Sequence, residues 1–143
     1  MVNRGSKVVV DTNAVLSSIY EKSKNHIIVD CIFNGCFDLF VSNSILLEYE
    51  EKINTNFSSI SSELFINALL ILPTVKKINT YFDLRLIYPD YDDNKFVDCA
   101  FACNAEYLVT NDKDYNILKS KQFPKINLIK IEHFVDLLKQ TFV

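Results

Sequence analysis

The sequence predicts an α/β protein in which helices cover both faces of a central parallel sheet of about five strands, a three-layer α/β/α arrangement. Short apolar, β-branched runs alternate along the chain with longer segments whose apolar residues recur at helical spacing. Strands that are separated by helices are joined by right-handed crossovers, which make the strands parallel and place helices on both faces. The chain has 143 residues, 49% of them hydrophobic, so we expect a single domain over residues 1–143 with a full core.

The first half of the chain predicts three strands and four helices. The strands are short, apolar and often β-branched, and they lie at 7–10, 37–41 and 75–78. The helices carry an apolar stripe, and they lie at 13–20, 25–33, 42–53 and 58–72. Asn34 and Gly35 stop the second helix, residues 42–44 offer N-caps for the third, and Pro73 ends the fourth.

The second half continues the alternation after residues 79–90, which lack a clear periodicity and are expected to be irregular or briefly helical. The predicted elements are a helix at 92–104, a strand at 107–109, a short helix at 115–119, a strand at 127–130 and an amphipathic helix at 131–140. In sheets of this kind ligands bind beyond the carboxyl ends of the strands. Residues that directly follow a strand are therefore the first candidates for a functional site.

Composition and charge restrict the class of protein. The net charge of -3 and the isoelectric point near 5.3 argue against a nucleic-acid binder that works through a positive overall field. The longest apolar run, residues 64–75, is interrupted by Asn67 and Pro73 and is too short to span a bilayer. No secretory signal is recognisable, since Asp11 interrupts the first apolar stretch. We therefore expect a soluble, cytoplasmic protein without a membrane partner.

The cysteines are expected to be buried free thiols of a reducing compartment. The chain contains Cys31, Cys36, Cys99 and Cys103. Cys99 and Cys103 lie on one face of a helix, but a zinc site would need CxxC pairs or neighbouring histidines, and the sequence has neither.

Two acids stand at the exits of buried strands. Asp11 follows the first strand and Asp112 follows the strand at 107–109. A carboxylate at the exit of a buried strand is costly unless a cation neutralises it. Glu48 and Asp93 lie in helical segments that can join these two acids, and such a set of carboxylates suggests a site for a hard divalent cation.

Each acid taken alone also has a plainer interpretation, which stays open at this point. Asp11 can be an N-cap, Glu48 a surface acid, and Asp93 one of several acids that the macrodipole favours at a helix start. Phe96 lies three residues after Asp93 and places it at the border of the buried face, whereas Asp98 is expected to be solvated.

Together, three segments resemble one family. They read VVVDTNAVLSS near the start, SNSILLEYEEKI in the middle and DDNKFVDCAFACNAEYLVTNDKDY near the end. The chain resembles the PIN-domain nucleases over nearly its whole length, and within them the VapC-like toxin components of bacterial toxin–antitoxin pairs. The last segment is the most specific of the three.

The resemblance implies four catalytic and metal-binding acids, which match Asp11, Glu48, Asp93 and Asp112. It also implies three polar residues that support them, which match Thr12, Asn13 and Thr110. Asp92 adjoins Asp93, so the choice of metal-facing acid between these two stays open. Asn111 stands where the family often has Gly, so the turn before Asp112 is expected to differ, and Asn tolerates the left-handed conformation.

The activity implied by the resemblance is metal-dependent hydrolysis of RNA with Mg²⁺ or Mn²⁺ as cofactor. A cognate antitoxin is the implied protein partner, and a homodimer formed through residues 42–72 is the implied assembly. Exposure of Phe57, Phe65 or Tyr81 would support that dimer. The candidate phosphate contacts are lysines that can equally be solvated surface charges, namely Lys7, Lys95, Lys113, Lys119 and Lys121.

Two rival functions are consistent with an α/β fold. A receiver or a phosphatase domain also gathers strand-end acids around Mg²⁺, but a receiver needs a third Asp on a middle strand. The phosphatase motif needs Asp-x-Asp, whereas this chain has Asp11-Thr12-Asn13. The second rival is a PIN module that binds RNA or protein without catalysis, and metal binding would separate it from a nuclease.

Overall fold

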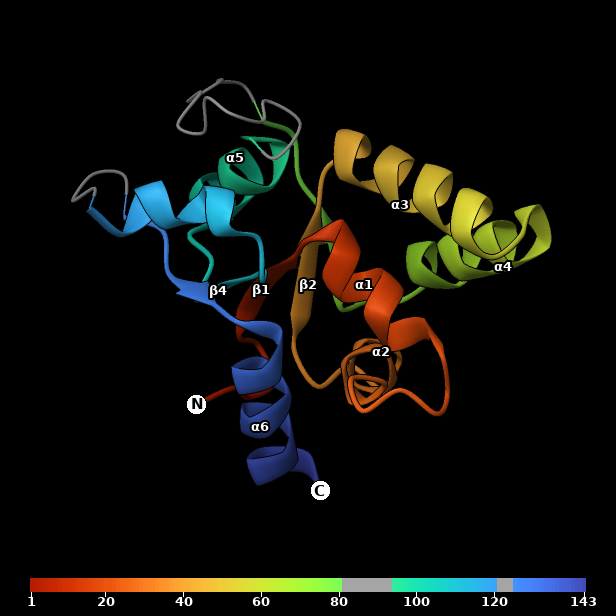
Figure 1. Cartoon of the computed structure of the whole chain (residues 1–143), viewed down its shortest axis with the longest axis horizontal. Coiled ribbons are helices and arrows are strands. Elements are labelled where there is room, and N and C mark those ends of the chain that lie inside the picture. Colours follow the sequence, from red (N-terminus) through yellow and green to blue (C-terminus); the bar gives the residue numbers. More distant parts are fainter. Residues whose placement is uncertain (81–93, 121–124) are drawn as a thin grey trace.

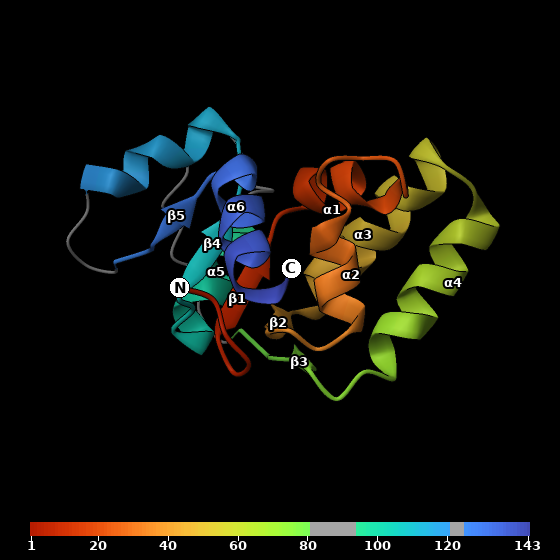
Figure 2. The same ribbon diagram turned by 90° about the horizontal axis from the view of Figure 1, so that it is seen from below.

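A computed structural model describes residues 1–80, 94–120 and 125–143 of the chain. Within these residues, five strands form one all-parallel sheet of order β3-β2-β1-β4-β5. The strands are β1 (Lys7–Val10), β2 (Asp38–Val41), β3 (Val75–Lys77), β4 (Tyr107–Val109) and β5 (Leu128–Ile129). Helices lie on both faces of the sheet (Figure 1, Figure 2), so the predicted three-layer α/β/α class is confirmed.

The helices follow the predicted ranges closely. They are α1 (Thr12–Ile19), α2 (Ile27–Phe33), α3 (Asn43–Asn56), α4 (Ser59–Leu70), α5 (Asn94–Cys103), the 3₁₀ helix η2 (Lys113–Ser120) and α6 (Ile131–Phe142). Ser42 caps α3 by accepting a hydrogen bond from the Ile45 amide at 3.3 Å, and Ser58 caps α4 in the same way. The segment predicted as a short helix at 115–119 is longer and forms the tighter 3₁₀ helix.

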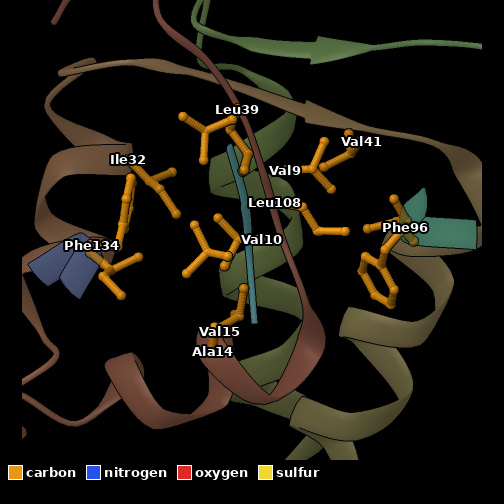
Figure 3. Packing of buried hydrophobic residues seen from close by; sticks show 14 of the residues in the cluster. Val9, Val10, Ala14, Val15, Ile32, Leu39, Val41, Phe96, Leu108 and Phe134 are labelled. Atoms are coloured by element: carbon orange, nitrogen blue, oxygen red, sulfur yellow. The ribbon is translucent and has the colours of Figure 1, made fainter. Parts of the chain in front are cut away.

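The central strand β1 is buried on both faces, which explains its continuous apolar sequence. Val8, Val9 and Val10 are fully buried. In Figure 3, Val10 points towards Phe134 of α6, while Phe96 of α5 lies on the other side of the strand. Burying β1 between two helical layers fixes the position of the residue that follows it.

The sheet reverses its strand order between β1 and β4. From β1 the chain moves outward through β2 to β3 and then returns to the other side of β1 to build β4 and β5. Ligands of open α/β sheets bind at such a switch point, beyond the carboxyl ends of the two strands. Asp11 follows β1 here, and its backbone amide donates to the carbonyl of Val109, the last residue of β4, at 3.1 Å.

Ile45, Leu46 and Tyr49 form the buried side of α3, and Leu47 points away from it and is 66% exposed. One predicted orientation was wrong. Asp98, expected to be solvated, is buried. Helix α5 packs against the sheet and also against α3, so more than one of its faces is covered.

The prediction that the four cysteines are buried free thiols is confirmed. Over the described ranges, no helix has both the length and the apolar character that crossing a membrane requires.

Candidate metal centre

Asp11 is held firmly at the carboxyl end of β1. Its Oδ1 accepts a hydrogen bond from the Ala14 amide at 2.8 Å and thereby caps α1, and its Oδ2 accepts a hydrogen bond from the hydroxyl of Thr110. The residue is only 5% exposed. The N-cap interpretation is therefore correct, and the same carboxylate also lies at the strand-order switch point.

The surroundings of Asp11 disfavour its negative charge. Burial raises the pKa of the Asp11 carboxyl from its ordinary 3.8 to about 6, and repulsion from Asp112 and Glu48 adds to this increase. The hydrogen bonds from Thr110 and Ala14 act in the opposite direction. Among the described residues, no lysine or arginine contributes to this balance. The site thus contains a buried carboxylate whose charge the described side chains leave uncompensated.

Glu48 approaches the same site from α3. Its Oε2 accepts a hydrogen bond from the Thr12 hydroxyl, and its Oε1 lies 2.6 Å from Nζ of Lys95 on α5. The Glu48 side chain is 18% exposed, so it is not an open surface acid. Next to it, Tyr49 donates a hydrogen bond from its hydroxyl to the carbonyl of Val10 and ties α3 to the end of β1.

Asp112 is positioned by the turn that follows β4. Its backbone amide donates to the hydroxyl oxygen of Thr110 at 3.1 Å, and its Oδ1 accepts from the Asp114 amide at 2.9 Å. Thr110 therefore contacts both strand-end acids, through its hydroxyl proton to Asp11 and through its oxygen to Asp112. The hydrogen bonds fix the separation of these two residues across the β1/β4 boundary.

The structure brings together three of the four predicted acids, because Asp112 and Glu48 both act electrostatically on Asp11. The third predicted acid, Asp93, and its neighbour Asp92 lie outside the described residues. Over the ranges that are described, no group of three His, Cys, Asp or Glu side chains is close enough to hold a metal ion by itself.

The supporting polar residues divide into two groups. Thr12 and Thr110 contact acids of the site, as the predicted supporting role requires, whereas Asn13 is exposed. Asn111, where the predicted turn differs from the family pattern, does not adopt a left-handed backbone. Its Oδ1 accepts the Ile131 amide at 2.8 Å and links the end of β4 to the start of α6.

The donor atoms of this site fit a hard divalent cation. Asp11, Glu48 and Asp112 offer carboxylate oxygens, which Mg²⁺ and Mn²⁺ prefer, and the four cysteines belong to the core. The burial of the Asp11 carboxylate beside Glu48 and Asp112 favours a cation most directly, because positive charge placed at this point would relieve the cost of ionising Asp11.

Sequence reasoning missed the pairing of Lys95 with Glu48. Lys95 was expected to be a phosphate contact or a solvated charge, yet it is only 21% exposed and forms an ion pair. The position of Lys7, another expected phosphate contact, is also informative. It lies at the amino end of β1, at the sheet edge away from Asp11, with its ammonium 6.0 Å from the centre of the Phe40 ring.

Removing the Thr110 hydroxyl should raise the pKa of Asp11 further. Thr110→Val deletes the hydrogen bond that stabilises the ionised carboxylate, so we expect the midpoint of Asp11 to move above about 6 in metal-free protein. Carbon-13 NMR titration of the aspartate carboxyl resonances in EDTA measures this midpoint. Thr110→Ser should restore the wild-type midpoint, and an unchanged midpoint in Thr110→Val would contradict the assigned role of the hydroxyl.

Comparison with known proteins adds a family and a set of similar folds. The family model of the PIN domain matches residues 7–114. One similar solved structure is VapBC2 from Rickettsia felis bound to a DNA fragment from its promoter, with 14% identity and a TM-score of 0.57 over 87% of this chain and 98% of that chain. VapBC-1 from nontypeable Haemophilus influenzae has 15% identity and a TM-score of 0.59 over 88% and 98% of the two chains.

A third similar structure is PAE2754 from Pyrobaculum aerophilum, with 16% identity and a TM-score of 0.54 over 96% of this chain and 99% of that chain. At these identities the three structures establish similarity of fold. No curated protein sequence matches the chain.

Proposed function

The chain belongs to the PIN domain family of nucleases, and on that premise we propose that it is a metal-dependent endoribonuclease that hydrolyses phosphodiester bonds in RNA. The observation that carries this proposal is the buried Asp11 carboxylate, which is repelled by Glu48 and Asp112 and is not balanced by a described cationic side chain. Such an arrangement is unfavourable in a protein that binds no cation and favourable in one that does.

Four residues would hold the Mg²⁺ or Mn²⁺ ion, namely Asp11, Glu48, Asp93 and Asp112. When bound, the ion supplies positive charge for the phosphate oxygens and increases the acidity of water at the site. Thr110 keeps Asp11 oriented, and Thr12 and Lys95 hold the two oxygens of Glu48. These contacts prepare the carboxylates before substrate arrives.

Among Asp11, Glu48 and Asp112, the three acids of the site that the structure describes, Asp112 is the best placed to accept a proton from the attacking water. Both oxygens of Asp11 and both oxygens of Glu48 already have partners, whereas Oδ2 of Asp112 receives no hydrogen bond from a described residue. Asp112 is also less buried than Asp11. An accessible carboxylate oxygen within a group of positioned acids is what a general base requires.

The biological role that we propose is the toxin of a toxin–antitoxin pair, which acts in the cytoplasm and is inhibited by a cognate antitoxin protein. Two of the similar folds are named as VapBC structures, one of them bound to DNA from its promoter. The buried free thiols are consistent with a reducing compartment. We propose further that the chain acts as one domain.

A homodimer through α3 and α4 is part of the same proposal. These helices and the residue after them expose large apolar side chains, namely Leu47, Ile60, Leu64, Leu70 and Ile71. Exposed apolar surface of this kind favours association. Phe57 and Phe65 contribute less than expected because they are half-buried against Tyr20 and Phe33, and Tyr81 lies outside the described residues.

Fewer alternative functions remain. Because the chain belongs to the PIN domain family, we set aside the receiver and phosphatase interpretations. A non-catalytic PIN module remains the second candidate, and it differs in one measurable property. A module that only binds RNA or protein has no need of a divalent-cation site, so Mn²⁺ binding measured by calorimetry separates it from the nuclease.

The test is cleavage of a mixed pool of structured RNAs with Mn²⁺ or with EDTA, by wild type and by Glu48→Gln. We expect cleavage to require the metal and to fall roughly 10²–10³-fold in Glu48→Gln, because the variant lacks one ligand charge. Glu51→Gln is the matched control, since Glu51 is an exposed acid of the same helix. Cleavage that persists in EDTA, or folded protein that never cleaves with any divalent metal, would contradict the proposal.

A further inference from the structure

A pocket lined by lysines lies directly beside Asp112. It encloses about 200 Å³ between the carboxyl ends of β4 and β5 and one side of η2. Among the described residues that line it are three lysines, Lys113, Lys119 and Lys130, and a single acid, Asp112. We call this site the lysine pocket. Positive charge gathers here in a chain whose net charge is -3.

The geometry of η2 explains why its lysines line the same pocket. A 3₁₀ helix has about three residues per turn, so residues spaced by three lie on one side. Lys113, Asn116 and Lys119 have this spacing and line the pocket, while Tyr115 and Leu118 face the core and are buried. The spacing of three residues therefore gives η2 one polar, cationic side that lines the pocket and one apolar side that packs into the core.

The lysines of the pocket are available to a ligand. Lys113, Lys119 and Lys130 are exposed, and none of them forms an ion pair with a residue in the described part of the chain. Lys95 differs, because its ammonium group already forms an ion pair with the Glu48 carboxylate. Exposed cations that line a concave site hold phosphate groups in place without reading sequence.

The size and lining of the pocket favour part of a polymer over a whole small molecule. Its volume of about 200 Å³ lies below the roughly 300–1,000 Å³ of sites that enclose drug-sized ligands. Leu128 and Ile129 are half-buried and contribute apolar surface to the lining, and Asn116 is a further polar residue of it. A lining that combines apolar surface with several cations suits one nucleotide unit of a strand that continues beyond the pocket.

We propose that the lysine pocket binds the phosphodiester backbone of the RNA strand on one side of the cleaved bond. This inference rests on the proposed function, since Thr110 and Asp112 belong both to the candidate metal centre and to the lining of the pocket. An RNA strand that occupies the pocket would run directly past the acids. The lysines hold the strand in position and do not touch the reacting atoms.

The experiment measures binding without cleavage. Fluorescence anisotropy with a labelled, mixed-sequence single-stranded RNA in EDTA compares wild type with Lys119→Ala, Lys130→Ala and the double variant. We expect each single substitution to raise Kd roughly three- to tenfold at low salt and to reduce the slope of log K against log salt by about 0.7, as the loss of one phosphate contact requires. The increase in Kd should be the same for RNAs of different sequence.

Lys139→Ala is the matched control. Lys139 is also an exposed lysine, and it lies nine residues further along α6 than Lys130, which is roughly 13 Å away from the pocket. This substitution removes the same charge from the protein and should leave Kd near the wild-type value. A Kd for the pocket variants equal to that of Lys139→Ala, or no measurable RNA binding by wild type in EDTA, would overturn the proposal.

The RNA-binding experiment and the cleavage experiment can fail separately, so each tests its own proposal. If the pocket variants lose RNA binding while wild type cleaves nothing, the lysine pocket is supported and the nuclease proposal fails. If cleavage depends on metal and on Glu48 while the pocket variants bind RNA normally, the nuclease is supported and the pocket proposal fails. Weakened binding of an antitoxin protein with unchanged RNA binding would also overturn it.

Discussion

Asp11→Asn is expected to lose at least roughly 10²–10³-fold in cleavage while it makes the metal-free protein more stable. The loss follows from the proposed function, because the amide removes the charge of Asp11, the most buried of the three proposed ligands that the structure describes. The shape of the site is retained, since an asparagine oxygen can still accept the Ala14 amide and cap α1. A variant that is inactive but folded and more stable would identify Asp11 as a functional acid.

The gain in stability depends on pH in a defined direction. The pKa of Asp11 is about 6 in the folded protein and has an ordinary value of 3.8, so the folded state binds the proton more tightly. The stability of wild type therefore falls as pH rises from about 4 to about 6, by about 3 kcal/mol for this group, and the cost persists above that range. Asp11→Asn carries no charge and lacks this decline.

Urea unfolding in EDTA at several pH values between about 4 and 7 measures the effect. The difference in unfolding free energy between Asp11→Asn and wild type should be small near the acid end and should grow towards neutral pH. Asp136→Asn, an exposed acid of α6, is the control and should follow wild type throughout. A constant difference across this range would contradict the assignment. Added Mn²⁺ should stabilise wild type and leave Asp11→Asn nearly unchanged.

Replacing Tyr49 should produce the second large effect, on stability. Tyr49 is fully buried, its burial raises the pKa of its hydroxyl well above the usual value, and this hydroxyl donates to the carbonyl of Val10. Tyr49→Phe keeps the ring and removes the hydrogen bond, which should cost about 1–3 kcal/mol because a buried acceptor loses its donor. Tyr49→Ala also leaves a cavity and should cost about 3–5 kcal/mol.

Chemical unfolding of both Tyr49 variants at neutral pH gives these free energies. Tyr20→Ala serves as the control, because Tyr20 is 69% exposed and its main aromatic contact is Phe57, so we expect a loss below about 1 kcal/mol. If Tyr49→Phe has the same unfolding free energy as wild type, the hydroxyl does not tie α3 to β1. Because Glu48 adjoins Tyr49, activity should also fall in Tyr49→Phe under conditions in which the variant remains folded.

The fold was predictable because it depends on the spacing of apolar residues and on the order of strands and helices along the chain. Both can be read directly from the sequence. The runs at 7–10 and 107–109 are short, β-branched and separated by helices, and only a parallel sheet with two helical layers buries such runs. The meeting of Asp11 with Thr110 and Asp112 was predictable for the same reason, since carboxyl ends of parallel strands lie at one edge.

The rest of the site depends on how helices rotate about their axes, which the sequence does not display. The ion pair of Lys95 with Glu48 requires α5 to turn one particular side towards α3. Asp98 is buried for a similar reason, because α5 is covered by two neighbours, while the prediction assumed a single buried stripe. Asp93 stays a prediction, since it lies outside the described residues.

The pairing of β1 with β4 has a consequence for biosynthesis. The first strand hydrogen-bonds to a strand about a hundred positions later, and the hydroxyl of Thr110 reaches Asp11 over a separation of 99 residues. Contacts of such high sequence separation form late and slow the folding of a domain. During translation Asp11 is synthesised long before Thr110 and Asp112. We therefore expect translation products that end before these residues to lack an assembled site. Synthesis itself thus delays assembly of the site until residues 107–112 have been made.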